Sequence, residues 1–403
     1  MKRRRRLPAA GLCLAAAGCL FLGLAVRQAH LRKSWLSACP REPDLAGWPA
    51  ELHERVAGDS LRLRKWPPDT AALGELARLY QANGFLPEAE TAYRALLGYD
   101  PRNPSWPHLL GVLLAGFGRM DEAVPLFRRS IGLDPGDVAG RLHLADALLK
   151  SNDMAGAGTA YQELLDRSPD NPYAELGLAR VALAGDRRGA ALKMLRGLVA
   201  ANPEFYGAHD LLASLDEEFG ADQEAAIERE RAGKGRFREA PDPLFDSLMD
   251  DCYDPYRLQV FAATAIAVRA YSDALPPLRR ALGLAPDNGR TLRQLGLVYL
   301  KTGDNARARE NLERAVALDP SNDGAVFDLV NAYQDMGEKA AAVNALAEGI
   351  KRIPESPGLH YDYARALIDA GRVPEAIPEL EAAERLNPDN HGAAEELARI
   401  RAH

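Results

Sequence analysis

Apolar and polar positions follow a helical period through most of the chain. After residue 67, large apolar residues recur at spacings of three and four, which places them on one face of an α-helix. Alanines and glycines interrupt this apolar face at regular intervals. The first part of the chain differs, because the twenty residues from Leu7 to Val26 carry no charge. The pattern therefore predicts one apolar helix followed by a long series of amphipathic helices.

Prolines mark a repeat of 34 residues. Each proline is 34 residues from the next within two series, Pro67, Pro101, Pro135, Pro169, Pro203 and Pro286, Pro320, Pro354, Pro388. A proline cannot continue a helix, so each one separates two repeating units. A unit of this size cannot bury its apolar face alone, and we infer that neighbouring units stack.

The segment from Asp287 to Pro320 resembles the tetratricopeptide repeat (TPR), a helix–turn–helix unit of 34 residues. The residues that match the first helix of the family are Leu295, Gly296 and Tyr299, and those that match the second are Ala308, Leu312 and Ala315. Leu312 stands where an aromatic residue is usual. The resemblance implies an all-α fold, a right-handed α-solenoid of stacked units. The uncharged segment before residue 27 adds a single predicted transmembrane helix in front of it.

The predicted organisation follows from the two proline series. We expect five repeats over residues 68–236 and four over residues 254–388, with a capping helix at 389–403. Residues 27–67 form a predicted linker with a short helix near Glu51–Leu63. Glycines fall in the turns between paired helices, where a left-handed backbone is expected: Gly84, Gly118, Gly185, Gly303, Gly337 and Gly371.

Residues 7–26 are a predicted membrane anchor. Twenty helical residues span about 30 Å, the thickness of a bilayer core. A basic flank, residues 1–6, precedes the segment, and Arg27 and Arg32 follow it. The greater density of positive charge before the segment favours a single-pass protein whose body lies on the exported, periplasmic side. Two alternatives stay open, a cleaved signal peptide and a lipoprotein carrying its lipid on Cys19, which ends a lipobox-like Ala-Ala-Gly-Cys.

Charge is distributed unevenly between the two ends. Residues 1–66 carry a net charge of +8, and the remainder carries −15. An acidic body does not suit nucleic acid, whose phosphates require clustered cations. Basic or neutral proteins are better partners for such a surface, although an acidic surface with no binding role is the more common case.

An acidic insertion, residues 237–253, interrupts the repeat. It carries four aspartates, with Asp254 directly after it, and the apolar residues Phe245, Met249 and Tyr253. Three interpretations stay open for it: a hinge between two groups of repeats, a docking element for a partner, and a metal or catalytic site. The spacing of its carboxylates lacks the alternation and the glycine of a calcium loop.

No catalytic motif is found in the sequence. It contains no phosphate-binding loop, no GxSxG and no HExxH, and its eight histidines are scattered. His143 is expected to pack or to face solvent. Cys39 and Cys252 are expected to be unlinked thiols, and no cysteine pair has metal-site spacing. We therefore predict no enzyme, no cofactor, no metal site and no small-molecule substrate.

The resemblance implies that first-helix residues line a concave groove for partner proteins or peptides. The residues at those positions are Arg78, Arg180, Tyr256, Gln259, Arg293, Lys301, Phe327, Asn331, Tyr361 and Arg365. We expect a membrane-anchored scaffold or adaptor in assembly, secretion or biogenesis at a bacterial cell envelope. The alternatives are an exported lipoprotein and an enzyme subunit with its site in residues 237–253.

Overall fold

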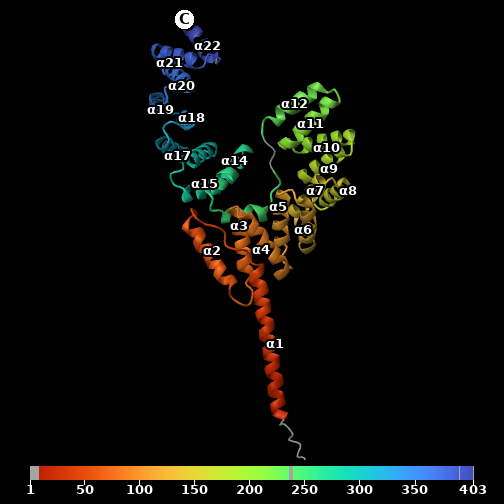
Figure 1. Ribbon diagram of the computed structural model, residues 1–403. Coiled ribbons are helices and arrows are strands. Elements are labelled where there is room, and N and C mark those ends of the chain that lie inside the picture. Colours follow the sequence, from red (N-terminus) through yellow and green to blue (C-terminus); the bar gives the residue numbers. More distant parts are fainter. Residues whose placement is uncertain (1–8, 236–238, 390, 403) are drawn as a thin grey trace, which may run out of the picture. The chain divides into compact units, whose positions relative to one another are not determined.

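The computed structural model describes residues 9–235, 239–389 and 391–402 (Figure 1). Within these ranges all regular secondary structure is helical, with 22 α-helices and one short 3-10 helix. The chain divides into two compact units between Tyr253 and Asp254, and each is described by itself. The predicted basic flank, residues 1–6, lies outside the described residues.

Helix α1 (Ala9–Ala38) precedes the repeats and is 30 residues long. Its last turns are anchored to unit 1 through Trp35, whose ring is fully buried and whose Nε1 donates a hydrogen bond to the carbonyl of Leu63 at 2.8 Å. The Trp35 ring also meets the ring of Tyr99 edge-on, with centroids 4.8 Å apart. Helix α2 (Ala50–Leu63) packs beside the first repeat and buries Leu52 and Val56.

The predicted anchor overlaps α1 from Ala9 onward, and its first two residues lie outside the described part of the chain. Over the described residues, the structure contains no helix that combines the length and the apolar character needed to cross a bilayer. The anchor therefore stays a prediction from the sequence.

Five helix pairs form the body of unit 1. Each helix packs on its partner, and each second helix packs on the first helix of the next pair. The pairs are α3 (Thr70–Ala82) with α4 (Leu86–Tyr99), α5 (Ser105–Gly116) with α6 (Met120–Leu133), α7 (Val138–Lys150) with α8 (Met154–Leu165), α9 (Pro172–Ala184) with α10 (Arg188–Ala201), and α11 (Tyr206–Glu218) with α12 (Asp222–Ala232).

Unit 2 contains four further pairs and a closing helix, arranged by the same rule. They are α14 (Pro255–Ala267) with α15 (Tyr271–Leu284), α16 (Gly289–Lys301) with α17 (Asn305–Leu318), α18 (Asp323–Asp335) with α19 (Lys339–Arg352), α20 (Pro357–Asp369) with α21 (Val373–Leu386), and α22 (His391–Arg401). Among the described residues, the paired helices confirm the all-α repeat architecture that the 34-residue period predicts.

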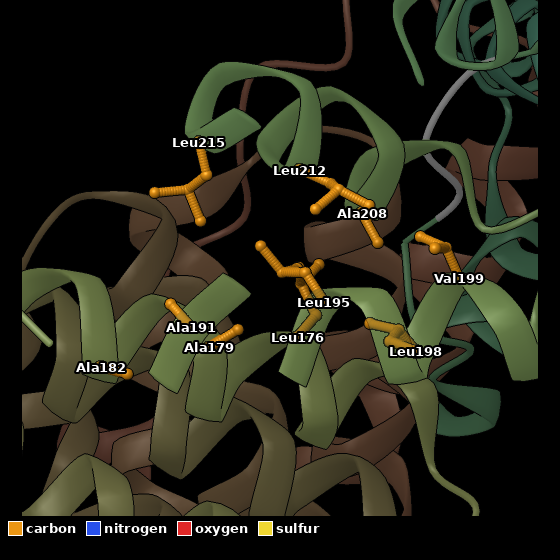
Figure 2. Close-up of a cluster of buried hydrophobic side chains, with 10 residues drawn as sticks. All are labelled: Leu176, Ala179, Ala182, Ala191, Leu195, Leu198, Val199, Ala208, Leu212 and Leu215. Carbon is orange, nitrogen blue, oxygen red and sulfur yellow. The ribbon is translucent and has the colours of Figure 1, made fainter. Parts of the chain in front are cut away.

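The core is built from leucines and alanines of three consecutive helices at a time. In Figure 2, Leu195 of α10 points between Leu176 of α9 and Leu212 of α11. Leu195 is fully buried, and Ala179 and Ala208 of the neighbouring helices leave space for it. Each helix thus buries its apolar face against its neighbours along the chain, which is the behaviour expected of stacked repeats.

Each turn within a helix pair contains one residue with a positive φ, two positions before the second helix begins. Glycine occupies this position in most of them, for example Gly84 with φ of 84°. In the turn before α10 the predicted left-handed conformation of Gly185 is wrong. Gly185 has a φ of −89°, and Asp186 has the positive φ of 56° instead. Gly185 lies one residue too early, and aspartate is one of the non-glycine residues that tolerate this conformation.

Candidate partner-binding faces and a buried histidine–aspartate cluster

Several first helices of consecutive pairs contact one another in each unit, and we call the surface of the first helices the first-helix face. Helix α5 contacts α7 and α7 contacts α9 in unit 1, while α14 contacts α16 and α16 contacts α18 in unit 2. The predicted partner-binding residues all belong to these first helices.

The insertion folds back onto the first-helix face of unit 1. Its two short helices, α13 (Pro243–Asp246) and η1 (Ser247–Asp251), contact α5 and α3 respectively. Figure 1 shows this segment, in green, beside α3 and α5. Leu248 and Cys252 are buried, whereas the predicted anchors Phe245 and Met249 are only partly covered. Residues 237 and 238 of the predicted insertion lie outside the described residues.

Polar contacts hold the end of the insertion against α3. Arg78, a predicted partner-binding residue, donates hydrogen bonds to Oγ and the carbonyl of Ser247, both at 3.2 Å, and pairs with Asp251 at 3.3 Å. Arg55 of α2 pairs with the same carboxylate at 2.9 Å. The guanidinium of Arg78 is therefore already engaged by this chain's own insertion.

Asn83, which ends α3, joins the repeat to the insertion through its amide. Its Nδ2 donates to the carbonyls of Leu79 at 2.7 Å and of Asp251 at 2.9 Å, and its Oδ1 accepts from the backbone N–H of Tyr253 at 2.6 Å. Asn83 is only 4% exposed. One side chain thus satisfies three buried backbone groups, which leaves little freedom for the segment that it holds.

A cluster of two histidines and two aspartates fastens the start of the insertion. Oδ2 of Asp242 lies 2.8 Å from Nε2 of His108 on α5 and 2.9 Å from Nε2 of His143 on α7. The Nδ1 of His108 lies 2.9 Å from Oδ2 of Asp137, the residue that caps α7. The side chains of His108 and Asp242 are almost fully buried, and that of His143 is 33% exposed.

The carboxylates control the charge of this cluster. Burial by itself lowers the pKa of His108, but hydrogen bonds to Asp137 and Asp242 and the negative charge of both raise it to about 9. Burial raises the pKa of Asp242, and this effect is outweighed by the two histidine hydrogen bonds, which hold that pKa far below its usual range. The pKa of Asp137 is lowered against burial by His108 and by the backbone N–H of Gly140.

Arg180 lies at the far end of the same face. It lines a cavity of about 300 Å³ between α7, α9 and the first residues of the insertion, together with His143, Tyr173 and Glu239. The hydroxyl of Tyr173 donates to the carbonyl of Glu239 at 3.2 Å. The insertion therefore lies against the first-helix face of unit 1 from α3 to the start of α9, while Arg180 itself stays exposed.

Unit 2 has a groove between first helices α18 and α20 and second helix α19, and two of the predicted residues line it. Asn331 of α18 and Arg365 of α20 are both exposed and line one cavity of about 640 Å³. Lys339, Asp362 and Arg372 also line it. Burial raises the pKa of Asp362, and the nearby Arg365 opposes this shift only in part.

The other predicted residues of unit 2 lie in different surroundings. Arg293 pairs with Asp328 of the next repeat at 2.5 Å, and Tyr361 has the guanidinium of Arg365 over its ring at 5.9 Å. Tyr256 is 63% exposed at the start of α14. Of these three residues only Tyr256 is exposed, while Arg293 and Tyr361 are half-buried.

The three remaining predicted partner-binding residues are Lys301, Phe327 and Gln259. Lys301 is exposed at the end of α16, and Phe327 is half-buried against the backbone at Gly358. Gln259 is only 5% exposed, and its Nε2 donates to Thr291 at 2.7 Å. Its amide therefore joins two neighbouring helices of the repeat stack and is not available to a ligand.

No local motif in the sequence indicates the cluster of His108, His143 and Asp242. Asp242 is 134 residues from His108 and 99 from His143. The two histidines do fall in the first helices of consecutive repeats, 35 residues apart, which is one residue more than the period. That near-periodic pair was the available signal, since a repeat offset places both rings on one face.

Comparison with protein families gives matches along most of the chain. Two family models, both described as tetratricopeptide repeat, match it repeatedly. The first matches residues 75–138, 108–172 and 262–323, and the second matches residues 149–215, 299–357 and 339–400. Together these matches cover well over half of the chain.

Among curated proteins, the chain is similar to cellulose synthase operon protein C of Pseudomonas fluorescens (strain SBW25). The two are 27% identical over 174 residues, which is 40% of this chain and 13% of that protein. The chain thus matches only a small part of its relative.

Solved structures resemble the chain at low identity. MamA (residues 41 to the end) from Desulfovibrio magneticus RS-1 is 16% identical, with a TM-score of 0.38 over 41% of this chain and 93% of that one. YrrB, described as a TPR protein with an unusual peptide-binding site, is 15% identical, with a TM-score of 0.30 over 60% of this chain and 98% of that one.

Proposed function

Because the chain belongs to the tetratricopeptide repeat family, whose members are typically non-catalytic, we propose that it is a scaffold that holds a partner peptide on the first-helix face of unit 2. The observation that carries this proposal is the contrast between the two faces. On unit 1 the insertion occupies the face at α3 and α5 and already engages Arg78, whereas Asn331 and Arg365 are exposed in a groove of about 640 Å³ in unit 2. A groove with both cationic and amide groups suits the backbone and carboxylates of an extended peptide.

Site-specific photo-crosslinking in the native cell tests this proposal. A crosslinking residue at Asn331 should give discrete adducts with a protein partner, and the same residue at Glu384, exposed on second helix α21, should not. Arg365→Glu should reduce the Asn331 adducts at least tenfold, because it replaces a cation of the groove with an anion. Equal adducts at both positions, or adducts unchanged by Arg365→Glu, would count against the groove as the binding face.

We further propose that residues 7–26 anchor this scaffold in a membrane, with the repeats on the exported side. The uncharged length of the segment and its basic flanks support the anchor. The likeness to a bacterial cellulose synthase operon protein supports a place in envelope assembly, secretion or biogenesis.

Membrane extraction separates the anchor from its alternatives. The full chain should resist extraction by alkaline carbonate, and a chain lacking residues 7–26 should be released. Mass spectrometry of the mature N-terminus then separates the two forms of attachment, because a lipoprotein would begin at a lipid-modified Cys19 whereas a helical anchor would keep the residues before it. Release of the unaltered full chain by carbonate would refute both forms of attachment.

A further inference from the structure

His108, His143 and Asp242 bring three ligand atoms together at one point of unit 1. Among the described residues they are the group of histidine, cysteine and carboxylate side chains that could hold a metal ion, with the three atoms all within 4.8 Å of one another. Two of the contacts, at 2.8 and 2.9 Å, share Oδ2 of Asp242. The ligands come from α5, from α7 and from the insertion, so an ion there would bridge all three.

Each ligand is oriented from behind by a further contact. Nδ1 of His108 lies 2.9 Å from Oδ2 of Asp137, and Oδ1 of Asp137 is fixed by the backbone N–H of Gly140 at 2.7 Å. This leaves Nε2 of His108 directed at the cluster. A carboxylate that accepts from the second ring nitrogen of a ligating histidine is a recurrent feature of zinc sites, because it fixes the tautomer and raises the basicity of the ligand.

The other two ligands are fixed in the same manner. Oδ1 of Asp242 accepts from the backbone N–H groups of Leu244 and Phe245, both at 3.1 Å, which leaves Oδ2 directed at the histidines. The ring of His143 stacks on that of Phe127, with centroids 5.4 Å apart and 15° between the planes. Because these side chains are already oriented, the entropic cost of ordering them when a metal ion binds is smaller.

We propose that this cluster is a zinc site that fastens the insertion to the second and third repeats. Two imidazoles and one carboxylate are ligands that Zn²⁺ accepts, whereas Mg²⁺ and Ca²⁺ require more oxygen donors. The two negative charges of Asp242 and Asp137 balance the double positive charge of one Zn²⁺. The ion would replace the protons that lie between the two Nε2 atoms and Asp242, and a water would complete the four ligands that Zn²⁺ prefers.

Metal titration of the purified full chain, stripped with a chelator, tests this site. Calorimetry should show one equivalent of Zn²⁺ bound, and Co²⁺ should give the visible absorption of a four-coordinate ion that Zn²⁺ then displaces. His143→Asn and Asp242→Asn should each weaken binding about 100-fold. His360→Asn is the matched control, since His360 also pairs with a carboxylate, Glu379, but has no second histidine beside it.

Folding and docking are followed in the same samples. Circular dichroism establishes that each variant is folded, and His143→Asn keeps the contact between His108 and Asp242 if Asp242→Asn does not fold. Zn²⁺ should also slow chymotryptic cleavage of residues 239–253 in the unaltered chain, with no such protection in His143→Asn. The proposal is overturned if the unaltered chain binds no Zn²⁺, or if His143→Asn and His360→Asn bind it equally well.

Discussion

Gly177→Ala should destabilise unit 1 by about 3 kcal/mol, although alanine is the better helix former. A Cβ at this position of α9 would lie far closer than 3.0 Å to ring atoms of Tyr161 on α8, a separation that real Cβ atoms essentially never show. The Tyr161 ring is fully buried, and its hydroxyl donates to Asp146, so the ring has no space into which to move. Overpacking of this kind forces helices apart.

The same substitution at Gly197 provides the control. Gly197 lies inside α10, and a Cβ there would meet nothing within 4 Å. Gly197→Ala should therefore stabilise the unit by up to about 1 kcal/mol through helix propensity alone. Chemical denaturation of both variants measures the difference, and a Gly177→Ala variant as stable as Gly197→Ala would show that α8 and α9 are not in close contact.

Asn83→Ala should release the insertion from the first repeat. The substitution removes three hydrogen bonds and leaves the carbonyl of Asp251 and the N–H of Tyr253 without this partner in a buried place. Each buried polar group deprived of its partner costs about 1–3 kcal/mol, so docking should weaken by about 3 kcal/mol. Chymotryptic cleavage after Phe245 or Leu248 should then be about 100-fold faster, because cleavage follows the population of the opened state.

Asn331→Ala is the control for this experiment, since Asn331 is exposed in unit 2. It should leave cleavage within residues 239–253 unchanged, and helical content should be the same for both variants. If Asn83→Ala is cleaved no faster than the control, the contacts made by Arg78, Arg55 and the histidine cluster hold the insertion without Asn83.

Local patterns in the sequence were sufficient to predict the repeats. They were not sufficient to predict which residues are exposed on the first-helix faces. Helix pairs could be predicted because every pair repeats the same apolar stripe, as in Leu295, Gly296 and Tyr299. Which residues of a first helix are exposed depends on the rotation of that helix about its axis. In α14 this rotation buries Gln259 and leaves Tyr256 exposed. The position of Asp186 shows the same limit within a turn.

The path of the insertion could not be derived from local patterns either. Its contacts join residues far apart in the chain, and nothing near Asp242 indicates that His108 and His143 lie beside it. The expectation that His143 packs or faces solvent does not include its contact with Asp242. A near-periodic pair of histidines, read together with an acidic segment outside the repeat, was the only indication of a shared site.

The contacts of Asn83 and Arg78 also set the order in which unit 1 can be completed during synthesis. Repeat arrays normally fold from one unit to the next, because each touches only its neighbours. Here the first repeat finds its partners 168 to 170 residues later. The ribosome must therefore release all five helix pairs before the first is finished, and closing so long a loop ties the end of the array to its beginning. Fraying from the first repeat, the usual weak point of such a stack, is then coupled to the opening of residues 239–253.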